Sequence, residues 1–122
     1  MSIQRLHVGP RMSEVAIHNG VVYLAGQVAD DPSLDIEGQT GQVLAAIDRL
    51  LGEAGSDKTQ ILQATIFLKT IDDFSAMNAV WDKWVPAGKT PPRATVEARL
   101  ARPEYLVEVK IIAALSASAP GR

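Results

Sequence analysis

Arg93, Glu97 and Arg99 recur at even spacing along the stretch TPPRATVEARL, which runs from Thr90 to Leu100. This spacing indicates a strand that presents the three charges on one face. An arginine guanidinium is permanently charged and binds a carboxylate through two parallel hydrogen bonds, so it can anchor an acidic substrate. A solvated strand face produces the same pattern, and the stretch alone leaves both interpretations open.

A second candidate group, Glu108, lies in the alternating stretch 105–115 and shares a face there with Lys110 and Ile112. A glutamate can hold a water molecule or exchange a proton with it. Together with Arg93 it suggests a small carboxylated substrate and a positioned water. The pattern is interpreted as two neighbouring strands that carry Arg93 and Glu108. An arginine and a glutamate in such positions also form ordinary cross-strand ion pairs.

The elements that must position these groups follow from the periodicity of apolar residues. Strand patterns occur at 3–8, 14–18, 21–28, 59–70, 93–100 and 104–115. Asn19-Gly20 is a strong hairpin signal between the second and third of these strands. Apolar residues at helical spacing occupy about residues 37–54 and 71–85, and Gly55 is placed to end the first helix. The order β-ββ-α-β-α-ββ favours an α+β domain with two helices on one face of a sheet.

The alternation also predicts which side chains are buried. In the stretch 59–70 one face is apolar and should pack on the core: Leu62, Ala64, Ile66 and Leu68. In the second helix four residues share a face, and its methionine and aromatic residues are interpreted as core: Phe74, Met77, Asn78 and Trp81. The sheet face without helices mixes charges with apolar residues such as Phe67 and Ile112. Because a second copy of the chain would cover such a face, we expect a homo-oligomer.

Size and charge limit the classes of function. The chain has 122 residues, from which we predict one domain over residues 1–115 and a flexible tail over 116–122. A formal charge of -2 argues against a nucleic-acid or membrane-surface binder, because both require a cationic surface. No apolar run approaches a membrane span and no secretory signal is recognisable, so a cytoplasmic protein is expected.

Cofactor chemistry finds little support in the sequence. There is no cysteine, which excludes disulfides, thiolate catalysis and cysteine-ligated metals. The two histidines, His7 and His18, lie in separate strand-like segments, whereas a stable metal site usually has three or four converging ligands. Phosphate-binding and dinucleotide-binding glycine motifs are absent as well. We therefore expect no metal site.

Four stretches in the same order and spacing resemble the reactive intermediate deaminase family, the RidA or YjgF-like proteins. They are GPRMSEVAIHNGVVYLAGQVA, QTGQVLAAIDRLLGEAGSD, ATIFLKTIDDFSAMNAVW and PPRATVEARL…YLVEVKIIA, and together they span about residues 9–114. The resemblance implies a chorismate-mutase-like α+β fold assembled as a homotrimer, with active sites in clefts between subunits. It also implies hydrolysis of small carboxylated enamines and imines to 2-oxo acids and ammonia, without a cofactor.

The resemblance also assigns site residues by position. The carboxylate-binding arginine of the family falls on Arg93, and the glutamate that positions the attacking water falls on Glu108. A backbone contact falls on Gly26 in the AGQ turn, and a pocket-wall asparagine falls on Asn78. The best-studied subgroup has a pocket tyrosine where this chain has Arg11 and a cysteine where it has Thr95. The pocket is thus expected to differ in shape and charge, and Arg11 is either a pocket or a surface residue.

Three functions remain open from the sequence. The first is a hydrolytic deaminase of 2-imino acids and their enamines, in which Arg93 holds the carboxylate and Glu108 the water. The second is a non-catalytic binder of small carboxylates, or a chaperone-like trimer, that uses the same clefts. The third is a ribonuclease, an activity of relatives, which the acidic composition and the lack of a basic groove disfavour.

Overall fold

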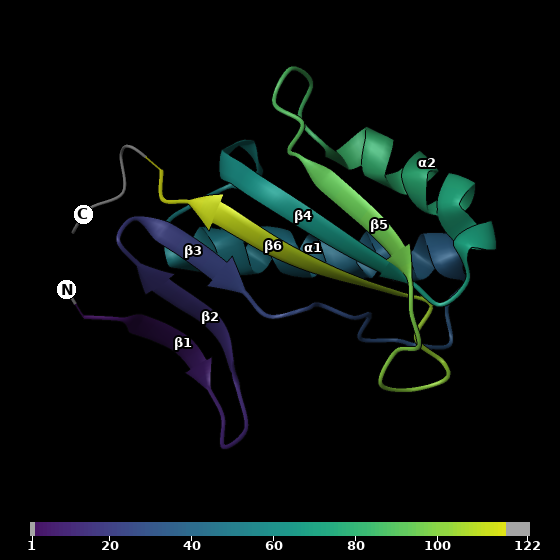
Figure 1. Ribbon diagram of the computed structural model, residues 1–122, viewed down its shortest axis with the longest axis horizontal. Coiled ribbons are helices and arrows are strands. Elements are labelled where there is room, and N and C mark those ends of the chain that lie inside the picture. The colour runs from purple at the N-terminus through teal and green to yellow at the C-terminus, as the bar shows by residue number, and fades with distance from the viewer. Residues whose placement is uncertain (1, 117–122) are drawn as a thin grey trace.

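The computed structural model describes residues 2–116, which form one six-stranded sheet and two α-helices (Figure 1). The strands are β1 (Gln4–Val8), β2 (Ser13–His18), β3 (Val21–Leu24), β4 (Ile61–Leu68), β5 (Arg93–Glu97) and β6 (Val107–Ala114). The helices are α1 (Ile36–Ala54) and α2 (Phe74–Trp84), with short 3₁₀ turns η1 (Lys58–Gln60) and η2 (Ile71–Asp73). The predicted order of elements is confirmed, although most of the strands are shorter than predicted.

The strands lie side by side in the order β1-β2-β3-β6-β4-β5. Every neighbouring pair is antiparallel except β4 and β5, which run parallel because α2 lies between them in the chain. In Figure 1 α1 runs behind the sheet and α2 lies beside β5, so both helices leave the opposite face of the sheet uncovered. The fold is the predicted α+β arrangement of two helices on one face of a mixed sheet.

Local signals in the sequence set the ends of several elements. Asn19 and Gly20 have φ of 52° and 77°, and His18 pairs with Val21 across the turn, so the predicted hairpin is confirmed. Gly55 ends α1 in the left-handed region, at φ 88°. Asp35 begins this helix, since its side chain accepts a hydrogen bond from the backbone N–H of Gly38 at 2.8 Å.

Two predictions about the strands are wrong. β5 and β6 are not neighbours, because β6 pairs with β3 and β4 while β5 pairs only with β4 at the edge of the sheet. Consecutive strands pair often but not always, and here the parallel pairing of β5 with β4 takes it away from β6. Leu62 is 48% exposed, since the register of β4 against β6 shifts between Ile61 and Gln63 and turns its side chain out of the core.

The core lies between the helices and one face of the sheet. Its strand residues are Val15, Ile17, Val22, Leu24, Ile61, Ala64, Ile66, Leu68, Val107, Val109, Ile111 and Ala113. From α1 it takes Val43, Leu44, Ile47, Leu50, Leu51 and Ala54, and from α2 Met77 and Trp81. None of the described helices has the length and apolar character that a membrane crossing requires.

One buried polar residue fixes the start of β6. Gln39 of α1 is fully buried, and its side-chain amide donates to the carbonyl of Glu104 at 3.0 Å and accepts from the N–H of Leu106 at 2.9 Å. These two bonds hold the segment that leads directly to Glu108. At the other end of β6, Ser116 donates from its backbone to the carbonyl of Gly55 at 3.0 Å, and the rest of the predicted tail lies outside the described residues.

Candidate functional site

The Arg93 side chain lies against two aromatic rings of α2. Its guanidinium carbon is 5.2 Å from the ring centre of Trp81 and 5.8 Å from that of Phe74, which is the geometry of a cation–π contact. Arg93 pairs with Ala64 of β4, and Ala64 is fully buried under the helices. Because paired residues point to the same side of a sheet, Arg93 lies on the helix-covered face, at its β5 edge.

Thr95 and Asn78 lie on this same side of the molecule. Thr95 pairs with the buried Ile66, and Asn78 sits on α2 between the two rings that contact Arg93. The Oγ1 atom of Thr95 and the Oδ1 atom of Asn78 are both buried and have no hydrogen-bond partner among residues 2–116. A buried polar atom without a partner is uncommon and points to a group that is supplied from outside the chain. We call Arg93, Thr95 and Asn78 the arginine half-site.

Glu108 lies on the opposite face of the sheet. It pairs with Phe67 of β4, whose side chain points away from the buried Ile66 and Leu68 on either side of it. This is the face that no helix covers, and Tyr23 and Val96 on it are 46% and 43% exposed. Glu108 itself is half-buried.

Gly26 is the immediate neighbour of the Glu108 carboxylate. A Cβ atom at Gly26 would fall 2.8 Å from Cδ of Glu108 and closer still to Oε2, so only glycine leaves room for the carboxylate in this position. The turn is held by Gln27, which exchanges backbone hydrogen bonds with Val109 at 2.8 and 3.1 Å. The N–H groups of Ala25 and Gln27 are both bonded, whereas that of Gly26 has no partner in the described chain. We call Gly26 and Glu108 the glutamate half-site.

The two half-sites do not meet within one protomer. β5 and β6 are separated by β4, which puts their axes roughly 9–10 Å apart, and Arg93 and Glu108 point to opposite faces. The prediction that they share one mixed face of neighbouring strands is therefore wrong. Among residues 2–116 the ion pairs are His7–Glu53 and Arg102–Glu104, and neither involves a half-site residue.

Arg11 belongs to neither half-site in this structure. It lies in the connection between β1 and β2, where its side chain is exposed, and it makes no hydrogen bond or ion pair with another described residue. Glu14, close to it in β2, does contact the turn that carries Gly26, because its carboxylate accepts a hydrogen bond from the side chain of Gln27 at 3.1 Å. Any role of Arg11 in the pocket thus remains a prediction.

Comparison with known proteins places the chain in a family. The sequence model described as Endoribonuclease L-PSP matches residues 2–115. The chain belongs to this family. Similar curated proteins include a RutC family protein of Haemophilus ducreyi, 49% identical over 114 residues, which cover 93% of this chain and 97% of the relative. The RutC family protein YoaB of Escherichia coli is 48% identical over 115 residues, which cover 94% and 100%.

Solved structures agree with the membership of the L-PSP family. A member of the YjgF protein family from Neisseria meningitidis superposes with a TM-score of 0.93 at 49% identity, covering 95% of this chain and 97% of the other. YyfA of the Rid protein family, from Yersinia pestis, superposes with a TM-score of 0.81 at 35% identity, covering 88% and 90%. The resemblance to RidA and YjgF-like proteins, and the fold it implies, are confirmed.

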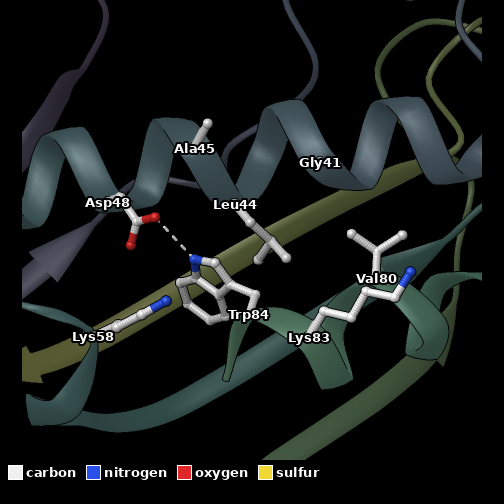
Figure 2. A pocket seen from close by; sticks show the side chains of 8 residues that line it. All are labelled: Gly41, Leu44, Ala45, Asp48, Lys58, Val80, Lys83 and Trp84. Atoms are coloured by element: carbon white, nitrogen blue, oxygen red, sulfur yellow. Dashed lines mark hydrogen bonds between the residues drawn. The ribbon is translucent and has the colours of Figure 1, made fainter. Parts of the chain in front are cut away.

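A separate groove of about 390 Å³ lies between α1 and α2 of this L-PSP family protein (Figure 2). It contains none of the predicted site residues. Its indole, Trp84, donates to Asp48 at 2.9 Å, and the ammonium of Lys58 lies 5.3 Å from the ring centre. Among the described residues, no buried side-chain nitrogen or oxygen in the groove is left without a partner. We interpret the groove as part of the packing between the two helices.

Sequence reasoning missed the part that Phe74 and Trp81 play beside Arg93. The two residues are seven positions apart on α2, and their helical spacing predicts both as core residues. Trp81 is indeed 5% exposed, but Phe74 is 40% exposed, because it lies at the open edge beside β5. Residues two turns apart on a helix share a face, so the helical spacing alone places Phe74 and Trp81 together. Their contact with Arg93 could be predicted only if β5 were known to be the strand beside α2.

The unpartnered hydroxyl of Thr95 leads to a stability prediction. Replacing Thr95 by valine keeps the shape and removes a buried polar atom without a partner, so Thr95→Val should raise the free energy of unfolding by about 1 kcal/mol in ligand-free protein. Chemical denaturation measures this, with Thr65→Val on the uncovered face of β4 as the matched control. A loss of stability in Thr95→Val alone would mean that the hydroxyl already has a partner in the assembled protein.

Proposed function

We propose that this protein hydrolyses 2-imino acids and their enamine tautomers to 2-oxo acids and ammonia. The observation that carries the proposal is the arginine half-site, where a guanidinium without an acidic partner lies near two buried polar atoms without partners. Such a set suits a small ligand with a carboxylate and further polar groups. Membership of the family that includes YjgF and Rid proteins supports the proposal through the resemblance described above.

In the proposed reaction Arg93 binds the carboxylate of the substrate and thereby holds its C=N carbon in the cleft. Glu108 holds a water molecule and accepts a proton from it as the water oxygen adds to that carbon. Glu108 returns this proton to the nitrogen, which gives a carbinolamine. The C–N bond then breaks as the nitrogen takes up the proton of the new hydroxyl group, so that ammonia leaves and a C=O bond remains. Imines already hydrolyse in water, so orientation and electrostatic stabilisation are all that the site has to supply.

The reaction requires both half-sites around one substrate, and one protomer holds them on opposite faces of its sheet. We propose that a homotrimer brings the arginine half-site of one protomer against the glutamate half-site of its neighbour. The mixed, uncovered face with Tyr23 and Val96 exposed supports an assembly that covers it. The free N–H of Gly26 beside Glu108 would then offer a hydrogen bond to a substrate or water in the cleft.

The first test is an imino-acid panel on the wild type beside Arg93→Ala. The imines are generated in place, for example 2-aminoacrylate from serine by a PLP-dependent dehydratase, and the release of oxo acid is followed. We expect acceleration by the wild type and a loss of at least about 100-fold in Arg93→Ala, because the lost contact is a charged, bidentate one. Glu108→Gln should retain carboxylate binding and lose turnover.

The same panel also distinguishes imine hydrolysis from the two other functions, ligand binding alone and RNA cleavage. Thermal stabilisation by 2-oxo acids without acceleration of any imine, lost in Arg93→Ala, would replace catalysis by binding alone. The printed description of the family names an endoribonuclease. RNA cleavage that survives both Arg93→Ala and rigorous repurification, without acceleration of any imine, would favour that activity over the proposed function.

The second test uses Gly26. In Gly26→Ala the new methyl group would occupy space that the Glu108 carboxylate now fills, and the carboxylate can turn away at little energetic cost because it ends a flexible side chain. We therefore expect turnover to fall more than about tenfold while the free energy of unfolding changes by about 1 kcal/mol or less. Gly41→Ala is the control, since a methyl group at Gly41 of α1 would contact nothing within 4 Å. Equal turnover in both variants would contradict the placement of Glu108 in the active site.

A further inference from the structure

The guanidinium of Arg93 is held by aromatic rings and not by a carboxylate. Trp81 and Phe74 lie 5.2 and 5.8 Å from it, and neither of the ion pairs of the described chain involves it. A buried or half-buried arginine is usually oriented by an acidic partner, which occupies the same N–H donors that a ligand's carboxylate needs. A contact with a ring face uses none of those donors.

The ring of Trp81 is itself fixed in place. Trp81 is 5% exposed, and its ring packs against that of Trp84 at 5.3 Å with a tilt of 51°. Trp84 is anchored in turn by its hydrogen bond to Asp48 of α1 (Figure 2). Phe74 is one turn before Asn78 on the same helix, so the rings and the unpartnered amide oxygen face β5 together. The orientation of Arg93 is therefore tied to the packing of the two helices.

We infer that Trp81 and Phe74 are positioning residues, which hold the Arg93 guanidinium so that its donors point at the carboxylate of the substrate. This inference rests on the proposed function, and it adds to it residues that no resemblance assigned. Loss of these rings should therefore have a specific effect on the kinetic constants. The carboxylate is bound alike in the ground state and the transition state, so loss of the rings should raise KM and leave kcat nearly unchanged.

The variants that test this are Trp81→Leu and Phe74→Leu, with Trp81→Phe and Phe74→Tyr as conservative replacements. Phe74 is 40% exposed, so Phe74→Leu is expected to fold even if Trp81→Leu does not. Val80→Ala is the control, because it removes apolar contacts of the same helix in the groove between α1 and α2, away from Arg93. Denaturation curves show which variants are folded.

Two measurements are made on each variant. The first is the NMR signal of the Arg93 Nε–Hε group, which ring currents shift when the guanidinium lies over Trp81 and Phe74. The second is the affinity for a short 2-oxo acid by calorimetry, together with KM and kcat for the most active imine. We expect the Arg93 signal to move in both leucine variants and the affinity to fall about tenfold, with KM rising by the same factor. The conservative variants and Val80→Ala should stay within about twofold of the wild type.

The possible outcomes separate the inference from the proposed function. An Arg93 signal that does not move in Trp81→Leu or Phe74→Leu overturns the inference, and so does unchanged affinity where the wild type binds. A fall in kcat at constant KM overturns it too, since that would place the rings in the chemical step. If the wild type binds no 2-oxo acid while the Arg93 signal moves as expected, the proposed function fails and the aromatic positioning of Arg93 stands.

Discussion

The parallel pairing of β5 with β4 is the constraint on which the rest of the site depends. Because α2 connects these two strands, β5 is placed at the edge of the sheet and directly beside that helix. The register pairs Arg93 with Ala64 and Thr95 with Ile66, which turns both side chains toward α2. A shift of one residue would put them on the uncovered face and away from Phe74, Asn78 and Trp81.

The same sheet separates the glutamate half-site from the arginine half-site. β6 lies between β3 and β4, and its register with β4 directs Glu108 to the face without helices. Gln39 fixes the segment before β6, and the bridge between Gln27 and Val109 sets Gly26 against the carboxylate. Each half-site is thus placed by its own strands, and each lacks what the other has. In the proposed trimer a site divided in this way would give a chemical reason for oligomerisation, beyond the need to cover apolar surface.

Much of the fold could be predicted from the sequence, since its signals are local. The Asn19-Gly20 turn, the end of α1 at Gly55 and the apolar spacing of both helices each depend on nearby residues. The neighbours of β5 and β6 could not be predicted from local signals, because no short sequence motif specifies which strands distant in the chain will pair. The exposure of Leu62 escaped prediction for a similar reason, as it follows from an irregular register with β6.

Arg93 and Glu108 were candidates from their residue types and alternating strands, whereas Gly26, Asn78, Thr95 and Arg11 came only from a resemblance. The sequence pattern did not indicate that Arg93 and Glu108 face opposite ways. Nor could it reveal that Arg93 lies over Trp81, since that contact joins α2 to an edge strand that was expected elsewhere in the sheet. The chemistry of single residues was thus predictable, whereas their division into two half-sites was not.

The most direct test of this division is complementation between two inactive variants. Arg93→Ala and Glu108→Gln are mixed in equal amounts, unfolded in denaturant and refolded together, so that protomers of both kinds assemble at random. If each site combines one protomer's Arg93 with a neighbour's Glu108, about one quarter of all sites in the refolded mixture are intact and about that fraction of wild-type activity returns. A refolded mixture no more active than the two variants refolded separately would contradict a site shared between protomers.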